Sequence, residues 1–176
     1  MKRTIKWIII IVALFIIAHF IIDYYFQGID YRETFRTKYH TADSGQIIET
    51  SHFKIQTPIN WIHIFQGYGH EGDAGGFFIT KHGTINYEYG IFANPFEVDS
   101  ILVFQKDSMT LNRFTIFIGK NKCNESGIHI PRQHEMELPF SFYMSKSCTE
   151  NFVDLTNGIK KMEFKKFYNN KWIEEE

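Results

Sequence analysis

The chain has no excess of basic residues and few cysteines. Its 176 residues include 19 Lys and Arg against 20 Asp and Glu, and two cysteines. Setting aside Lys2, Arg3 and Lys6, which precede a long apolar run, leaves 16 basic and 20 acidic residues, a net charge of −4. A nucleic-acid-binding protein needs a concentrated basic face. The charge balance therefore argues against nucleic acid as a partner.

The motifs of several enzyme classes are also missing. No serine lies in a G-x-S-x-G elbow, the turn that exposes the nucleophile of α/β-hydrolases. The run from Gly67 to Gly72, GYGHEG, has the G-x-G-x-x-G spacing of a dinucleotide-binding turn. A β-type run follows it in place of the helix that would meet the pyrophosphate. We interpret this run as a strand connection, expect no cofactor, and leave the catalytic residues unknown.

One long apolar segment lies near the N-terminus. Trp7 to Ile22, WIIIIVALFIIAHFII, carries no formal charge. Counted from Ile5 to Phe26, the segment would span about 33 Å as a helix, enough to cross a hydrocarbon core of about 30 Å. Trp7 and the aromatic residues 24–26 suit the two membrane–water interfaces. The sequence therefore predicts a transmembrane helix that contacts the lipid bilayer through residues 5–26.

A cleaved signal peptide and a buried helix of a soluble protein are the alternatives. A signal peptide ends at a small-x-small cleavage site, which is missing between Ala18 and Asp23, and no cysteine follows that could carry a lipid. A core helix rarely begins at residue 5 with four consecutive isoleucines. Because Lys2, Arg3 and Lys6 precede the segment, the positive-inside rule predicts a cytoplasmic N-terminus and an extracytoplasmic C-terminal domain.

The rest of the chain predicts one mostly antiparallel domain. We expect an anchor at 1–26, a juxtamembrane stalk with at most a short helix at 27–46, an α+β extracytoplasmic domain at 47–168, and a frayed tail at 169–176. Short alternating runs rich in Ile, Phe, Thr and Tyr favour strands. They lie at 53–57, 61–65, 76–80, 85–92, 114–118, 127–130, 140–144 and 163–168, with a hairpin turn at 81–84. Strands and helices do not alternate, which excludes a doubly wound sheet.

One amphipathic helix is expected late in the chain. Residues 147–150, SCTE, fit a capping box that satisfies free backbone donors at a helix start. Apolar residues then recur at spacings of three and four, at Phe152, Leu155, Ile159 and Met162. Gly158 should cost this helix about 1 kcal/mol relative to alanine. The predicted fold class is α+β, mostly antiparallel sheet with a late amphipathic helix, preceded by one N-terminal transmembrane helix.

The first strand of the domain carries a resemblance. Residues 53–61, FKIQTPINW, resemble the F-x-I-x-x-P-x-x-W opening of many small exported bacterial proteins, uncharacterised envelope proteins of the Bacteroidota among them. They are also similar to the opening of PsbP-type domains, in which helices pack on an antiparallel sheet. The resemblance covers nine residues. It implies a fold and a bacterial envelope setting, and it carries over no active-site residues.

Two groups of residues are candidates for a binding site. The aromatic and imidazole side chains that could line one concavity are Trp61, His63, Tyr68, His70 and Tyr87. The second group lies in one loop, where His70, Glu71 and Asp73 offer the imidazole and carboxylate ligands that divalent metals accept. The alternative for that loop is a solvated connection without metal.

The two cysteines leave several interpretations open. Outside the cytoplasm, Cys123 and Cys148 are permitted to form a disulfide, which would stabilise the domain by about 3 kcal/mol by closing the intervening loop. In a reducing cytosol they would be free thiols. Together with His129 and His134 they contain the atoms of a tetrahedral zinc site, although their spacing is not that of the usual zinc motifs.

The sequence therefore supports three classes of function. The favoured hypothesis is a non-enzymatic membrane-anchored accessory that binds an envelope protein or a ligand. The first alternative is an envelope hydrolase or metal-dependent enzyme that uses the His70–Asp73 loop. The second alternative is a structural subunit of a larger membrane complex.

Overall fold

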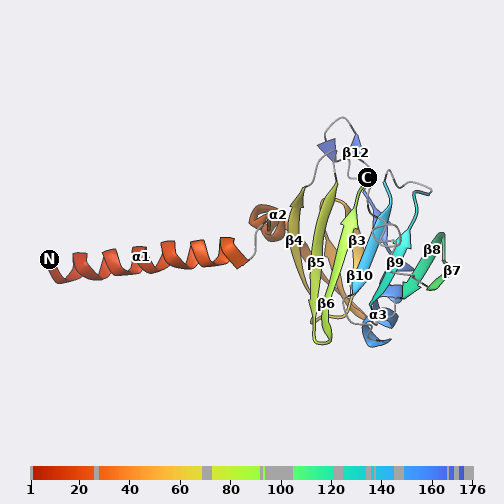
Figure 1. Ribbon diagram of the computed structural model, residues 1–176, viewed down its shortest axis with the longest axis horizontal. Helices are drawn as coiled ribbons and strands as arrows, with labels where there is room; N and C mark the ends of the chain where they lie inside the picture. The colour runs from red at the N-terminus through yellow and green to blue at the C-terminus, as the bar shows by residue number, and fades with distance from the viewer. Residues whose placement is uncertain are drawn as a thin grey trace.

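The N-terminal helix α1 (Lys2–Tyr25) projects away from the rest of the molecule (Figure 1). This computed structural model describes residues 2–25, 28–68, 73–91, 93, 105–120, 125–133, 136, 138–144, 149–165, 167–168 and 171–172. The 18 residues Thr4–Ile21 are apolar enough to cross a membrane, and none of them is buried. The helix therefore fits a single-pass anchor or a signal sequence, and it is not a core helix of the domain.

The first sheet has four antiparallel strands in the order β1-β2-β3-β11. They are β1 (Lys38–Ala42), β2 (Gly45–Glu49), β3 (Phe53–Thr57) and β11 (Glu163–Phe164). β3 alternates as predicted, because Phe53, Ile55 and Thr57 are buried while the residues between them are partly exposed. Helix α2 (Tyr31–Arg36) precedes this sheet and packs on the edge of the second sheet at β4.

The segment predicted as a stalk, residues 27–46, holds more structure than a short helix. The expected short helix is α2, but β1 and the first residues of β2 also fall in this segment and pair antiparallel from Lys38↔Glu49 to Ala42↔Gly45. The four-stranded sheet thus begins at Lys38. Sequence analysis missed β1 because its residues 38–41 are all exposed, so the strand has no alternating apolar face.

The second sheet has seven antiparallel strands in the order β4-β5-β6-β10-β9-β8-β7. Their bounds are β4 (Ile62–Tyr68), β5 (Ala74–Thr80), β6 (Gly83–Tyr89), β7 (Gln105–Leu111), β8 (Phe114–Lys120), β9 (Ser126–Ile130) and β10 (Phe140–Met144). The predicted hairpin is confirmed, with β5 and β6 paired from Ala74↔Tyr89 to Thr80↔Gly83. β7 was not predicted; the apolar run 101–104 that precedes it lies outside the described residues.

The C-terminal residues differ from the prediction in two ways. The single strand expected at 163–168 is divided into β11 and β12 (Phe167–Tyr168). β12 pairs with β13 (Lys171–Trp172), which lies in the tail that was expected to be frayed. The remainder of the 169–176 tail is outside the described residues. The prediction missed β13 because two residues are too few to show an alternating pattern.

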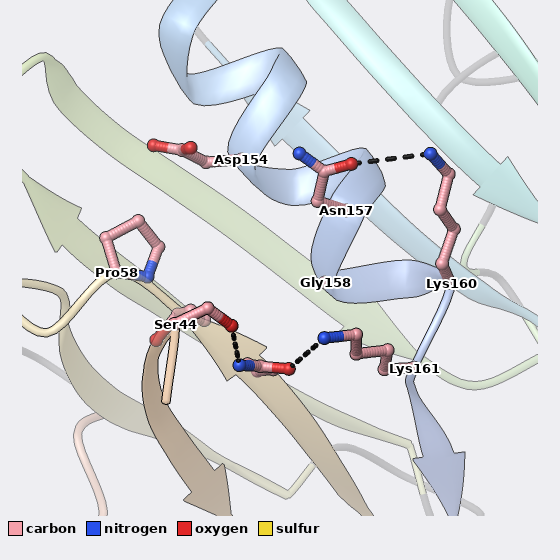
Figure 2. Close-up of a pocket in the computed structure, with 9 residues that line it drawn as sticks. Ser44, Pro58, Asp154, Asn157, Gly158, Lys160 and Lys161 are labelled. Carbon is pink, nitrogen blue, oxygen red and sulfur yellow. Dashed lines mark hydrogen bonds between the residues drawn. The ribbon is translucent and has the colours of Figure 1, made fainter. Parts of the chain in front are cut away.

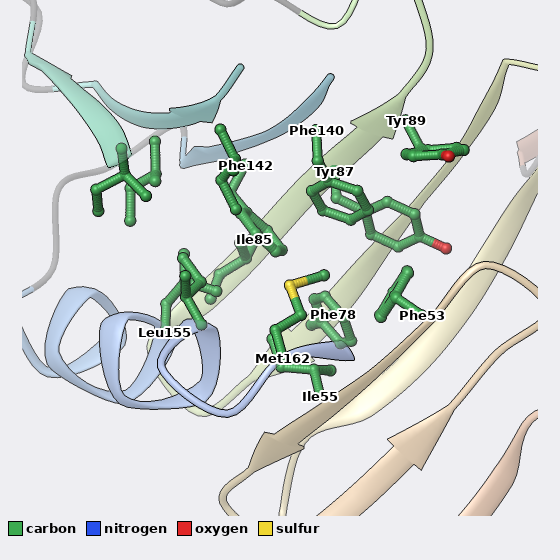
Figure 3. Packing of buried hydrophobic residues seen from close by; sticks show 14 of the residues in the cluster. Phe53, Ile55, Phe78, Ile85, Tyr87, Tyr89, Phe140, Phe142, Leu155 and Met162 are labelled. Carbon is green, nitrogen blue, oxygen red and sulfur yellow. The ribbon is translucent and has the colours of Figure 1, made fainter. Parts of the chain in front are cut away.

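Aromatic side chains fill the space between the two sheets (Figure 3). Phe53 of the four-stranded sheet meets four rings of the other sheet edge to face, with centroid distances of 5.1 Å to Phe140, 5.2 Å to Tyr87, 6.3 Å to His63 and 6.4 Å to Phe78. Such edge-to-face pairs contribute stability beyond the area they bury. The core is therefore a sandwich whose two halves are held together through Phe53.

Helix α3 (Thr149–Ile159) covers one end of this sandwich (Figures 1 and 3). The predicted stripe is confirmed for Leu155 and Ile159, which are buried, and for Phe152, which packs against the core partly buried. Met162 is buried too, but it lies beyond the end of the helix at Ile159. Gly158 allows the helix to approach β3, because a Cβ there would lie 2.6 Å from the Gln56 carbonyl oxygen. Ser147 of the expected capping box lies outside the described residues. The fold class, α+β and mostly antiparallel sheet, is confirmed.

Candidate binding site

His63 lies in a buried hydrogen-bonded network between the sheets. Its Nδ1 is 3.0 Å from Thr37 Oγ1, and its Nε2 is 2.8 Å from the Tyr87 hydroxyl. The Thr37 hydroxyl donates to the Glu33 carbonyl, so it accepts from Nδ1–H, and Nε2 accepts from Tyr87. Burial and the nearby His52 lower the pKa of His63 to about 3. The imidazole is therefore neutral, and both of its nitrogens are occupied.

The predicted pocket residues that the structure describes lie in two different settings. Trp61 is buried with its ring centroid 5.7 Å from that of Phe78, which also lies 5.5 Å from Tyr87. Tyr68 is 52% exposed at the far end of β4. His70 is outside the described residues. Trp61, His63 and Tyr87 thus come together as core packing around Phe78, and Tyr68 lies apart from them.

A second buried histidine, His52, was not predicted from the sequence. Its ring lies among those of Phe65, Tyr68 and Tyr89, at centroid distances of 6.0, 5.5 and 5.6 Å. Its Nδ1 is 2.9 Å from Ser51 Oγ. Burial and the charge of Lys165 lower the pKa of His52 to about 4. A general base is most effective when its pKa is near the working pH, so His52 is poorly suited to activate the Ser51 hydroxyl.

A serine–histidine pair, Ser141 and His129, lies on the outer face of the seven-stranded sheet, and its hydrogen-bonding groups are also occupied. His129 Nδ1 lies 2.9 Å from Ser141 Oγ, and the Ser141 hydroxyl donates to the Ala93 carbonyl. Because the Ser141 hydroxyl donates its hydrogen bond to a backbone oxygen, His129 Nδ1–H is the donor to Ser141 Oγ. His129 was also a zinc candidate; Cys123, Cys148 and His134 lie outside the described residues, as does the possible disulfide.

The predicted metal loop is described only at Asp73, because His70 and Glu71 are outside the described residues. Asp73 Oδ1 accepts a hydrogen bond of 2.9 Å from the Ile91 amide. Its carboxyl shares a cavity of about 300 Å³ with Glu88. Burial and the charge of Asp73 raise the pKa of Glu88. Across the described residues, no three His, Cys, Asp or Glu side chains gather closely enough to hold a metal ion.

A groove lies between α3 and the turn that joins β1 to β2 (Figure 2). Its volume is about 290 Å³, and it is lined by Ser44, Gln56, Thr57, Pro58, Asp154, Asn157, Gly158, Lys160 and Lys161. Gln56 occupies its centre, where its amide nitrogen donates to Ser44 Oγ and its amide oxygen accepts from Lys161 Nζ at 2.8 Å. This groove joins residues from three separate parts of the chain.

The groove combines positive charge with hydrogen-bonding groups. Lys161 donates to the Gln56 amide oxygen, and Lys160 Nζ lies 3.4 Å from the Asn157 amide oxygen. Amide oxygens are neutral, so these contacts orient the ammonium groups without cancelling their charge. Asp154 lies toward the other end of the groove in Figure 2. The arrangement suits binding of a carboxylate or another anionic group.

Sequence analysis did not identify this groove. The only signal in the sequence was Lys160-Lys161 at the end of the predicted helix, which suits the helix dipole. Nothing local links these lysines to Ser44 and Gln56, which lie more than a hundred residues earlier. Comparison of the chain with protein-family models, curated proteins and solved structures finds no match. The groove is thus a candidate site by its geometry and charge.

Proposed function

We propose that this chain is a single-pass membrane protein of the cell envelope whose extracytoplasmic α+β domain is a non-enzymatic accessory for another envelope protein. The observation that carries the proposal is α1. Its apolar stretch Thr4–Ile21 is fully unburied, although the domain closes its own core without it. Such a helix is stable only in an apolar surrounding, which a bilayer supplies. The basic residues Lys2, Arg3 and Lys6 at the start of α1 support a cytoplasmic N-terminus.

The interior of the domain supports a binding role over an enzymatic one. His52 and His63 have lowered pKa values of about 4 and about 3, and His63 has both nitrogens occupied by Thr37 and Tyr87. These side chains therefore hold the domain together. Among the described residues, the groove offers positively charged groups together with hydrogen-bonding groups, and we place the partner contact there, with a partner carboxylate on Lys160 and Lys161.

The anchor is tested by alkaline carbonate extraction of membranes. Wild-type protein should stay in the membrane pellet, and its purified form should retain Met1 by intact mass. A variant with Ile10→Lys and Ile11→Lys should lose the pellet association, because each lysine at a helix centre costs about 3 kcal/mol of insertion. Ile10→Leu with Ile11→Leu is the matched control. Loss of the first 20 or so residues in the mature protein would show a cleaved signal instead.

The partner contact is tested by zero-length crosslinking with a carbodiimide, which joins lysine amines to carboxylates in contact. Intact membranes should yield a crosslinked species in the wild type. Lys160→Arg with Lys161→Arg keeps the charge and removes the reactive amines, so this species should disappear. Lys81→Arg, in the exposed hairpin turn, should leave it unchanged. A species that persists in the double variant would place the contact elsewhere on the domain.

A further inference from the structure

Helix α2 presents its polar side chains to the domain and its aromatic and basic side chains to the outside. Glu33 and Thr37 are buried, whereas Phe35 is 85% exposed and Arg32 and Arg36 are exposed with it. A surface helix of a soluble domain normally has the opposite arrangement, with its apolar side turned inward. The outward face of α2 is therefore unusual for a surface that meets only water.

The inward face accounts for the polar residues of the helix. Thr34 Oγ1 accepts from the Phe65 amide at 2.9 Å, and the Thr37 hydroxyl contacts His63 Nδ1 at 3.0 Å. Glu33 Oε1 accepts from the Ser51 amide at 3.1 Å. These bonds fix the rotation of α2 on β4. Phe35 consequently cannot turn inward without breaking them.

The outward face carries positive charge. Arg32 and Arg36 of α2 are exposed, and so is Lys38, the first residue of β1. The two carboxylates of this segment accept from backbone amides and keep their charge: Asp30 Oδ1 caps the helix by accepting from the amides of Arg32 and Glu33, and the buried Glu33 accepts from the Ser51 amide. Three basic residues against these two carboxylates leave residues 30–38 with a net charge of +1. The combination of an exposed phenylalanine with flanking arginines is typical of segments that lie in a membrane interface.

The chain itself keeps α2 near the bilayer. α1 ends at Tyr25 and α2 begins at Tyr31, so the fully extended connection spans at most about 21 Å. The headgroup layer on each side of the hydrocarbon core is about 5–8 Å thick. In Figure 1, α2 lies between α1 and the edge of the sheet at β4. The first surface available to the outward face is thus the membrane that α1 enters.

We propose that α2 lies on the extracytoplasmic surface of the bilayer that α1 crosses, with Phe35 in the interface and Arg32 and Arg36 on anionic lipid headgroups. The proposal rests on the proposed function, because it needs α1 to be an uncleaved anchor. Its consequence is a domain held against the membrane through α2 and β4. The groove beside α3 then lies on a part of the domain away from this contact, where a second envelope protein can reach it.

The test uses the full chain in vesicles of phosphatidylcholine and phosphatidylglycerol that contain acyl-brominated lipid, which quenches tryptophan at short range. Two variants are compared in a Trp7→Phe background. Phe35→Trp reports on α2, and Val153→Trp is the control, since Val153 is 47% exposed on α3. The proposal predicts quenching of the added emission in Phe35→Trp and none in Val153→Trp. Adding Arg32→Gln and Arg36→Gln should weaken docking about five-fold per arginine.

The outcomes separate this inference from the anchor. Trp7 of the wild type, in the same vesicles, reports on α1. If Trp7 is quenched and Phe35→Trp behaves like Val153→Trp, the anchor stands and the docking of α2 is refuted. If Trp7 is not quenched, the proposed function fails as well. If the added tryptophan in Phe35→Trp is not quenched in the lipid vesicles but is shielded from solvent in native membranes, α2 binds a protein and the lipid proposal is overturned.

Discussion

Lowering the pH from 8 to 5 should destabilise the domain through His52 and His63. Their pKa values fall from 6.5 to about 4 and about 3 in the folded protein because both rings are buried. A histidine with a lowered folded pKa contributes its full stability above pH 6.5. That contribution is lost as the pH falls toward the folded pKa, because the unfolded chain then binds protons that the folded domain does not.

Between pH 8 and pH 5, the loss of unfolding free energy is set by protonation of the two histidines in the unfolded chain. At pH 5 an unfolded histidine of pKa 6.5 is almost fully protonated, whereas the two buried rings are almost entirely neutral. The linkage between protonation and folding then lowers the free energy of unfolding by about 2 kcal/mol for each ring, or about 4 kcal/mol for both. Typical domains have unfolding free energies of about 5–15 kcal/mol. A loss of about 4 kcal/mol is therefore a large fraction of the stability of such a domain.

The shifted carboxyl groups Glu49 and Glu88 do not mimic this effect. Burial alone would raise the pKa of Glu49, but hydrogen bonds and charges from Lys165, with His40 and Lys54, hold it at about 2. Glu49 is therefore ionised throughout the range, and its own contribution is lost only as the pH falls from 4.5 toward 2. The raised pKa of Glu88 acts in the opposite direction, making the folded state slightly more favourable as the pH falls.

The assay is urea unfolding of the full chain in a mild detergent, followed by the fluorescence of the buried Trp61. The difference in unfolding free energy between pH 8 and pH 5 should be about 4 kcal/mol in the wild type. His52→Gln and His63→Gln should each remove about half of this difference, whatever they cost at pH 8. A wild-type difference below about 1 kcal/mol, or one that neither variant changes, would refute the buried neutral histidines.

Three further predictions concern helix α3 and the metal loop. Gly158→Ala should destabilise the domain by about 1–3 kcal/mol in spite of better helix propensity, because its Cβ meets the Gln56 carbonyl; the exposed Asn157→Ala is the control, and a gain in urea midpoint for Gly158→Ala would contradict the close packing. Leu155→Ala should cost about 2–5 kcal/mol and Val153→Ala under about 0.5 kcal/mol by the same assay, and equal costs would mean that α3 is rotated. Chelation with EDTA should leave the thermal midpoint unchanged, since Asp73 binds the Ile91 amide; a fall of several degrees would restore the His70–Asp73 loop as a metal site.

The strands that could be predicted are those with one buried face. Phe53–Thr57 and Phe140–Met144 were predicted with their observed bounds, because apolar residues alternate in β3 and the aromatic-rich run FSFYM of β10 directly follows Pro139. β1 could not be predicted, since its pairing depends on the turn at residues 43–44 and on β2, with no buried face of its own. Its formation is decided by hydrogen bonds to a neighbour that local composition does not reveal.

Gly158 shows where a local argument gives the wrong sign. Helix propensity alone makes this glycine a cost to α3. In the folded domain it is the position at which α3 meets Ile55 and Gln56 of β3, with no room for a Cβ. The contact joins two segments about a hundred residues apart, so tertiary packing overrides propensity, and no pattern in the sequence could have shown it.

The candidate site was the least predictable part of the molecule. A list of aromatic and histidine residues cannot distinguish a pocket wall from a core, and His63 and Tyr87 belong to the core because β4 and β6 both turn these side chains inward. The groove depends on Gln56 meeting Lys161, a contact created by the docking of α3. Composition and charge did, by contrast, predict the apolar helix, because sixteen consecutive uncharged residues need no partner to be recognised.

The most direct test of the central claim, an uncleaved α1 in the membrane with the sandwich outside, is protease accessibility in intact spheroplasts. The full chain carries a C-terminal tag, and a cytoplasmic protein serves as the control for lysis. Protease added outside should remove the tag and digest the domain while the control protein stays whole. A tag that survives until the spheroplasts are lysed would contradict the account.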